Sequence, residues 1–202
     1  YKSNQQIKQL VDKNEVGRVT RMIVKDGHEG PKEIGCSSYF LDWLTDPEKN
    51  GGGTLMDFGC YGANLMTWIK NGERPISVSA ITHQLKPEVY PKVEDDATII
   101  LNYRDGSTGI IQASWAWPYS VKDLQVFGTK AQPYAQNDKT LVKYVQHNGE
   151  PTVIQTDQHY FENHIQYLEH VLRGNQLPEG DLGSISNNVM VVEILEAARR
   201  SA

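Results

Sequence analysis

The chain has 202 residues, of which 39% are hydrophobic and 22% are charged, and its formal net charge is -5. This length fits one well-buried domain of roughly 100–200 residues, and the composition is that of an ordinary globular protein rather than a disordered chain or a cysteine-rich scaffold. An acidic chain without a run of Lys or Arg argues against nucleic acid or an anionic membrane as the main partner, because both bind clustered positive charge. The apolar stretches fall far short of the roughly 20 residues that span a bilayer.

Cysteine use and the start of the chain bear on the compartment. With only Cys36 and Cys60, a disulfide framework is not expected, which favours a reducing compartment such as the cytoplasm. The chain opens at Tyr1 without an initiator Met and runs directly into a helical pattern, as a fragment of a longer polypeptide would. A leader upstream of Tyr1 would leave the periplasm open as an alternative. We expect residues 1–202 to form a single domain of a larger protein.

The first part of the chain predicts a helix, a strand and a long loop. Apolar residues recur at helical spacing before Gly17, and residues 18–25 alternate as a strand does. Residues 26–50 are rich in Gly, Pro and charged side chains but carry an aromatic cluster that includes Tyr39. We expect a long loop pinned by that cluster. Because long ordered loops are often functional, Tyr39 is a candidate substrate-binding residue.

The remainder of the chain predicts a central helix, a run of strands and two closing helices. Strands are expected at residues 76–85, 97–103, 108–117, 124–127, 140–146 and 151–155, and helices at 54–70, 159–172 and 185–199. Asp105-Gly106 and Asn148-Gly149 are typical of hairpin turns, since these residues tolerate positive φ. The predicted fold is therefore α+β, an open, mainly antiparallel sheet with helices on one face.

Several chemistry-bearing patterns are missing or incomplete. The sequence has neither the G-x-G-x-x-G fingerprint of a dinucleotide fold nor a phosphate-binding loop. His159 and His164 are five residues apart, so on a helix they point about 140° away from each other and are not expected to share a metal. Cys60 has no neighbouring His to activate it as a nucleophile. We expect no metal site and no covalent catalysis.

Two further patterns allow a structural and a functional interpretation. Gly51-Gly52-Gly53 could present backbone N–H groups to an anion at a helix start, or could simply give the backbone slack, which is the commoner case. Trp115 and Trp117 lie two apart on a predicted strand and so on one face. They could stack a sugar ring, but a packing role in the core or at a subunit contact is favoured.

The segment that bears most on function is Gly51–Asn64, which reads GGGTLMDFGCYGAN. If one helix runs through it, Asp57 and Tyr61 are four apart and share a face. A tyrosine can relay the proton of a substrate hydroxyl during oxidation if a nearby cation lowers its pKa from about 10, and an aspartate can hold that hydroxyl. The structural alternative is a capping box, in which Asp57 satisfies backbone donors of the first turn while Tyr61 belongs to the core.

This run resembles the signature of the C-terminal domain of the Gfo/Idh/MocA oxidoreductases, the family of glucose-fructose oxidoreductase and inositol dehydrogenase. The resemblance spans nearly the whole chain. Supporting segments are Lys13–Arg18, the hairpin of Asp95–Trp115, the V-x-G-T-K turn of Val126–Lys130 and the closing helix of Ser184–Ala202. Ala131 stands where the family usually has Gly after the G-T-K turn.

The resemblance implies a set of roles. In the family, an N-terminal Rossmann domain binds NAD or NADP and contributes a Lys from an E-K-P motif, and this chain has neither feature. The substrate-binding Asp of the family matches Asp57 and its catalytic His or Tyr matches Tyr61. Asn64 stands where many members have Asp, and it joins the substrate-binding candidates. Tyr61 with Asn64 is similar to the glucose-fructose oxidoreductase branch, which favours a sugar or polyol substrate.

Two functional hypotheses follow from these observations. In the first, the chain is the substrate domain of an NAD(P)-dependent oxidoreductase that moves hydride between the nicotinamide and a sugar or polyol hydroxyl, and the isolated chain is inactive. In the second, it is a non-catalytic binding or dimerisation module. An open sheet with one helix-covered face leaves its other face free, so a homo-oligomer that pairs through this face is expected in either case.

Overall fold

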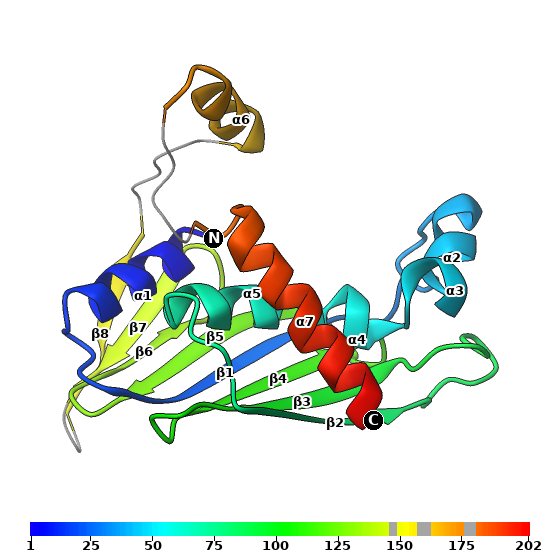
Figure 1. Ribbon diagram of the computed structural model, residues 1–202, viewed down its shortest axis with the longest axis horizontal. Coiled ribbons are helices and arrows are strands. Elements are labelled where there is room, and N and C mark those ends of the chain that lie inside the picture. The colour runs from blue at the N-terminus through cyan, green and yellow to red at the C-terminus, as the bar shows by residue number, and fades with distance from the viewer. Residues whose placement is uncertain (146–148, 157–162, 176–180) are drawn as a thin grey trace.

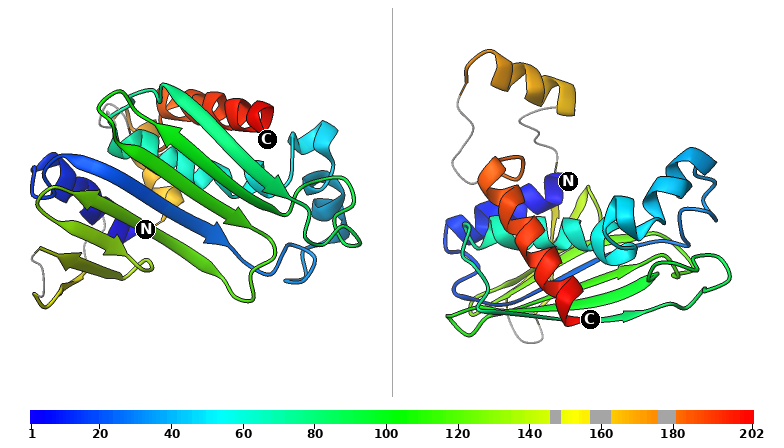
Figure 2. Two further views of the ribbon diagram at one scale, coloured as in Figure 1. Left: turned by 90° about the horizontal axis from the view of Figure 1, so that it is seen from below. Right: turned by 45° about the vertical axis from the view of Figure 1, so that its right-hand side comes forward.

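The chain forms one sheet with its helices gathered on one side (Figure 1, Figure 2). The structure, a computed structural model, describes residues 1–145, 149–156, 163–175 and 181–202. Its elements are α1 Lys2–Asp12, β1 Val19–Gly27, α2 Ser38–Leu44, α3 Pro47–Asn50, α4 Thr54–Asp57, α5 Gly59–Ile69, β2 Ser77–His83, β3 Asp96–Asn102, β4 Thr108–Ser114, β5 Val121–Gly128, β6 Gln132–Ala135, β7 Thr140–Tyr144, β8 Thr152–Gln155, α6 His164–Leu172 and α7 Ile185–Ser201.

The sheet is open and mainly antiparallel, which confirms the predicted fold class. Its strand order is β2-β3-β4-β1-β5-β6-β7-β8, so β1 lies in the middle although it comes first in the chain. Within the described residues, β1 and β4 form the one parallel pair. The turn at Asp105-Gly106 joins the antiparallel pair β3 and β4 as expected, and Gly106 adopts a φ of 82° there. The turn at Asn148-Gly149 lies partly outside the described residues.

Alternation along the central strands separates two faces. On β3, Ala97, Ile99 and Leu101 are buried while Thr98 and Ile100 are half-buried. The buried set faces α5 and α7, which lie across the sheet in Figure 1 and contribute Met66, Ile194 and other side chains to the core. The half-buried set lies on the face that carries no helix (Figure 2). This arrangement is the one expected when only one face of a sheet is covered.

The prediction of a long loop over residues 26–50 is wrong in its second half. Residues 38–50 form α2 and α3, because the Ser37 side chain accepts a hydrogen bond from the backbone N–H of Phe40 and Asp46 caps α3 in the same way. The aromatic cluster does not pin this segment either, since Tyr39 is 87% exposed and its neighbours Phe40 and Trp43 are also exposed. Leu44 is the side chain of α2 that is buried in the core.

The predicted single helix over residues 54–70 is also corrected. It is interrupted at Phe58, whose backbone (φ -101°, ψ -27°) ends α4 before α5 begins at Gly59. The Phe58 ring packs edge-on against His28, with ring centroids 4.9 Å apart. Asp57 and Tyr61 therefore do not belong to one continuous helix.

The sheet also contains strand β6, which the sequence analysis does not predict.

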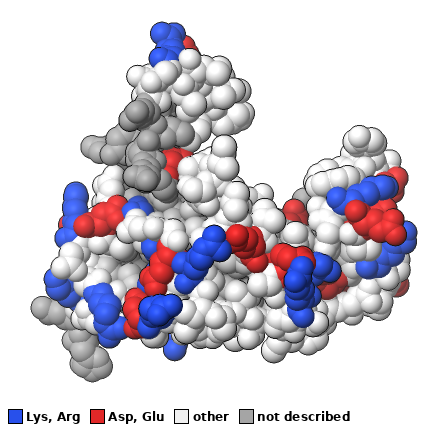
Figure 3. Space-filling model, in the orientation of Figure 1, with Lys and Arg blue, Asp and Glu red and all other residues white. Residues whose placement is uncertain are grey.

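The other helix predictions hold where the chain is described. The closing helix is present as α7, and α6 begins at His164 after an Asn163 cap rather than at His159, which lies outside the described residues. In the described ranges, none of the helices has both the length and the apolar character needed to cross a bilayer. Positive and negative side chains are interspersed on the face shown in Figure 3.

Candidate active site

Asp57 lies at the end of α4, with its side chain turned to the sheet. Its Oδ2 accepts a hydrogen bond of 3.0 Å from Nε1 of Trp115, a fully buried residue just after β4. In the described part of the chain no hydrogen bond reaches Oδ1, which leaves this oxygen to accept a bond from a ligand. Burial raises the pKa of the Asp57 carboxyl, while the Trp115 bond and the nearby His28 and Lys122 oppose that rise.

Tyr61 lies in the first turn of α5 and is 45% exposed, so the alternative that it is a core residue is wrong. The ammonium group of Lys122 lies over its ring, with Nζ 4.3 Å from the ring centroid. Partial burial raises the pKa of the Tyr61 phenol, and the charge of Lys122 acts in the opposite direction. Lys122 is thus a cation of this chain that lies against the phenol.

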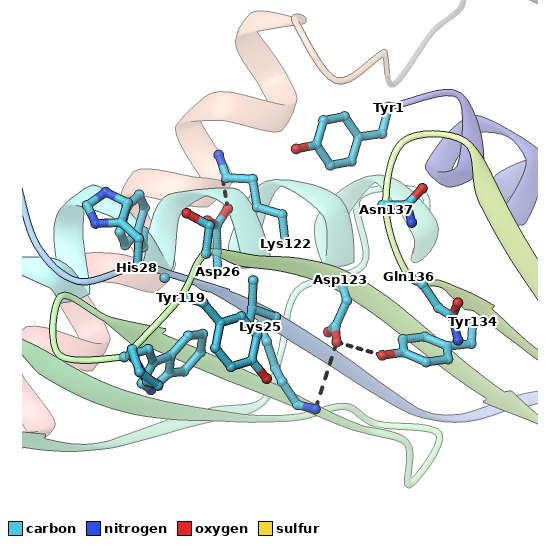
Figure 4. Close-up of a pocket in the computed structure, with 16 residues that line it drawn as sticks. Tyr1, Lys25, Asp26, His28, Tyr119, Lys122, Asp123, Tyr134, Gln136 and Asn137 are labelled. Carbon is cyan, nitrogen blue, oxygen red and sulfur yellow. Dashed lines mark hydrogen bonds and ion pairs between the residues drawn. The ribbon is translucent and has the colours of Figure 1, made fainter. Parts of the chain in front are cut away.

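A further acidic residue lies beside this group. Asp26 near the end of β1 is only 4% exposed, and its Oδ2 is 3.6 Å from Nζ of Lys122 on the neighbouring strand β5. Figure 4 shows this pair on the helix side of the sheet together with His28, while Lys25 and Asp123 extend to the other side. Burial raises the pKa of Asp26 to about 7 and lowers that of His28.

Two cavities lie beside this group of side chains, although Asp57 lines neither of them. The larger, about 1060 Å³, has a partly aromatic wall that includes His28, Phe58, Trp117, Tyr119, Lys122 and Tyr134 (Figure 4). The smaller, about 280 Å³, is lined by Tyr61, Asn64 and Lys122 among others. Lys122 and Asp26 border both cavities. The larger cavity exceeds the volume of a monosaccharide, and its aromatic and hydrogen-bonding groups suit a cyclic polar molecule.

The backbone donors at the glycine run are bonded to a carboxylate of the same chain. The carboxylate Oε1 of Glu94 accepts hydrogen bonds from the backbone N–H groups of Gly53 (2.8 Å) and Leu55 (3.0 Å) at the start of α4. These two donors are thus not open to an external anion. The capping-box alternative is wrong as well, because no side-chain cap bond forms at α4 and the Asp57 carboxylate is bonded to Trp115 instead.

The other residues predicted from the sequence are spread around the site. Asn64 lies one turn after Tyr61, and its Nδ2 donates to the carbonyl oxygen of Leu182 at 3.1 Å. Tyr39 on α2 lines neither of the two cavities. The strand β4 ends at Ser114, so the two tryptophans do not lie on one strand face as predicted. Trp115 is fully buried while Trp117 lines the larger cavity, and they do not form one stacking surface.

The described residues offer neither a reactive thiol nor a metal-binding cluster to this site. Burial raises the pKa of the Cys60 thiol to about 11, so the reactive thiolate is scarce at neutral pH. Across the ranges that the structure describes, His, Cys, Asp and Glu form no group of three or more that could hold a metal ion.

Asp26, His28, Trp115 and Lys122 are the site residues that sequence reasoning missed. Asp26 directly follows the predicted strand 18–25, and Lys122 precedes the predicted strand 124–127, so a slightly longer estimate of both strands would have included them. Their proximity could not be predicted, because it depends on the register that pairs Asp26 with Lys122 across β1 and β5.

The fold and the site together define an α+β domain with a carboxylate, a phenol and an ammonium group where the helices meet the sheet. Residues 4–132 match the family model described as the GFO/IDH/MocA C-terminal domain. The chain belongs to this family of oxidoreductases, as the resemblance of the Gly51–Asn64 run implied.

Individual relatives agree with this assignment. The chain is 28% identical to trans-1,2-dihydrobenzene-1,2-diol dehydrogenase of Xenopus laevis over 181 residues, which cover 82% of this chain and 51% of the relative. It is thus similar to about half of that enzyme. The crystal structure of GenD2 from gentamicin A biosynthesis, in complex with NAD, is 25% identical with a TM-score of 0.73, covering 99% of this chain and 58% of GenD2.

A third relative shows the breadth of the fold. The inositol dehydrogenase homolog of Azotobacter vinelandii, complexed with NAD⁺, has a TM-score of 0.77 at 15% identity, and the match covers 100% of this chain and 60% of that structure. At this identity the likeness concerns the fold alone.

Proposed function

We propose that this chain is the substrate-binding domain of a larger NAD(P)-dependent oxidoreductase that transfers hydride between the nicotinamide and a hydroxyl-bearing carbon of a sugar or polyol. The observation that carries the proposal is the position of Lys122, which borders both cavities, lies over the Tyr61 ring and is near enough to Asp57 to oppose the rise that burial causes in the pKa of that carboxyl. Membership of an oxidoreductase family, the likeness to a dihydrodiol dehydrogenase and the likeness to the NAD-bound structure of GenD2 support it.

Each residue has a defined task in this proposal. Asp57 accepts a hydrogen bond from a substrate hydroxyl through Oδ1, while Trp115 holds Oδ2 and thereby fixes the carboxylate. Tyr61, ionised to the phenolate, takes the proton of the reacting hydroxyl as the alcohol is oxidised, and the resulting phenol returns the proton in the reverse direction. Asn64 contributes a polar wall beside Tyr61, and Tyr39 on the exposed face of α2 contacts substrate only if a further domain closes over it.

We assign the dinucleotide site to another domain of the full-length protein. The sheet is mainly antiparallel, and the chain has no G-x-G-x-x-G turn at which a helix start could bind a pyrophosphate. A nicotinamide held by another domain would accept or supply the hydride. Because burial raises the pKa of Tyr61 despite Lys122, we propose that a second cation from that domain assists the phenol. The isolated chain is then inactive.

Turnover of the full-length protein tests the proposal. We expect oxidation of some members of a panel of cyclic polyols, aldoses and dihydrodiols with NAD⁺ or NADP⁺. Asp57→Asn should lower kcat/KM for the best substrate roughly 10- to 100-fold, because a hydrogen bond to a charged acceptor is lost. Asp12→Asn on the exposed side of α1 serves as the control. Absence of turnover across the panel, or equal kinetics for both variants, would contradict the proposal.

The uncovered face of the sheet supports a second proposal, that two copies of the chain pair there. Ile100, Ile110 and Ile23 lie side by side on β3, β4 and β1 by register, and each is half-buried on the face without helices. Exposed Ile81 (60%) extends this apolar surface on β2. Contiguous apolar surface of this kind typically marks a protein contact. The same surface would serve a non-catalytic assembly module, the alternative function.

A change of oligomeric state tests the pairing. We expect the protein to run as a dimer in size-exclusion chromatography with light scattering, and Ile110→Lys to shift it to the monomer mass with an unchanged circular dichroism spectrum. The matched control is Val192→Lys, at an apolar residue of α7 that is 61% exposed on the helix side. A monomeric wild type, or a dimer that persists in the Ile110 variant, would exclude this surface as the interface.

A further inference from the structure

Asp26 and Lys122 form an ion pair that the reaction proposed above does not yet use. They are register partners across β1 and β5 and lie on the helix-covered side, with Oδ2 and Nζ 3.6 Å apart. The Asp26 side chain is 6% exposed whereas that of Lys122 is 41% exposed. A half-exposed lysine side chain ordinarily samples many rotamers. An ion pair with a buried carboxylate restricts where its ammonium group lies.

The ammonium group lies where it can act on Tyr61. Lys122 Nζ is 4.3 Å from the centroid of the Tyr61 ring and 5.8 Å from that of Phe58. A cation over a phenol ring stabilises the phenolate, which is the form in which Tyr61 accepts the substrate proton. Lys122 also borders both cavities, so its side chain has space to move away from Tyr61 unless it is anchored.

Asp26 is otherwise poorly placed for a structural role. Its Oδ1 is buried and has no hydrogen-bond partner in the described part of the chain, so the carboxylate gains little besides the pairing with Lys122. Asp123, its buried counterpart on the other side of the sheet, differs in that its Oδ2 accepts a hydrogen bond of 2.9 Å from the Tyr134 hydroxyl. A buried and under-bonded carboxylate destabilises the fold, and such groups persist at functional sites.

We propose that Asp26 is a positioning residue that holds Lys122 over the ring of Tyr61, and that Lys122 is the cation of this chain that promotes proton transfer by the phenol. This inference rests on the proposed function, since it assigns Tyr61 the relay.

The surroundings of the pair make its charge sensitive to pH. Its neighbours with titratable groups are Asp57 from α4, Cys60 and Tyr61 from α5, and His28 from the segment after β1. With a pKa of about 7 for Asp26, the pair is fully ionic only above neutral pH. The hold on Lys122 should therefore weaken as the pH falls through 7.

The Asp26→Asn variant should fold. In the unfolded chain an Asp has a pKa near 3.9, whereas burial raises that of Asp26 to about 7, so the folded state binds the extra proton. Between these two pH values the stability contributed by Asp26 falls as the pH rises. Removing the carboxylate abolishes this loss, and at pH 8 the variant should melt at the wild-type temperature or above it.

The experiment uses the full-length protein with a fluorotyrosine at position 61, whose ¹⁹F signal reports the ionisation of that phenol without any turnover. We expect Lys122→Met to raise the pKa of Tyr61 and to lower kcat at neutral pH roughly tenfold with little change in KM. Lys122→Arg should restore most of both. Lys143→Met, a strand lysine paired with Glu15 at 3.3 Å and lining neither cavity, is the matched control.

A double-mutant cycle tests whether Asp26 acts through Lys122. If it does, Asp26→Asn lowers kcat, and the double variant Asp26→Asn/Lys122→Met is no slower than Lys122→Met alone. Additive losses, or a Tyr61 titration in Lys122→Met that matches the Lys143 control, would overturn the inference. The ¹⁹F titration separates this outcome from failure of the proposed function, because it reports on Lys122 even in a protein that turns over no polyol.

Discussion

In the proposed reaction, replacing Tyr61 with Phe should lower kcat of the full-length protein by about 10²- to 10⁴-fold, the usual contribution of a positioned acid-base group. The substitution removes only the hydroxyl and retains the ring. The centroid of this ring lies 6.2 Å from that of Phe58, and Lys122 lies over the ring. The fold and the affinity for substrate should change little. Steady-state kinetics on the best substrate of the panel, with thermal melts of both proteins, measure the effect.

A second tyrosine provides the control for this prediction. Tyr144 on β7 is 40% exposed and lines neither cavity, so Tyr144→Phe should retain the wild-type kcat. The pH dependence adds a further check, because the part of the kcat profile that depends on the phenol should be absent in Tyr61→Phe. Unchanged turnover in Tyr61→Phe would remove the relay role of this phenol.

Gly53→Ala should destabilise the protein by about 3 kcal/mol or more, the upper range for overpacking in a buried site. A Cβ at this position would overlap the carbonyl oxygen of Glu94, which is backbone and accepts the N–H of Thr54 at 3.1 Å. Neither group can move without breaking the contacts that begin α4. For a protein of this size the melting temperature should fall by roughly 6–12 °C, as calorimetry would show.

The neighbouring glycine supplies a matched control for the stability prediction. At Gly52 an added Cβ would meet the flexible Met56 side chain at 3.0 Å rather than backbone, so Gly52→Ala should change the melting temperature far less. Similar losses for the two variants would mean that the Glu94 contact does not determine the requirement for glycine. Because α4 carries Asp57, Gly53→Ala should also reduce activity at temperatures where the protein remains folded.

The sequence predicted which residues form the candidate site better than it predicted how they are arranged. The run from Gly51 to Asn64 placed Asp57 and Tyr61 near each other, and the structure brings both within the influence of one lysine. The physical reason given by the sequence pattern was wrong, since the helix is interrupted at Phe58. Tyr39 shows the limit of composition, because an aromatic cluster in a polar loop predicts burial only if something covers it.

Local patterns by themselves determined the fold class of this protein. Alternation, turn chemistry at Asp105-Gly106 and helical spacing depend on neighbours in the chain, so the mainly antiparallel sheet and its closing helix follow from the sequence. Only the tertiary structure decided that Lys122 lies over Tyr61, that Asp26 pairs with Lys122 and that Trp115 donates a hydrogen bond to Asp57. These contacts join residues 58 to 96 positions apart, and they exist because strand register and helix packing, which no local pattern encodes, bring the side chains together.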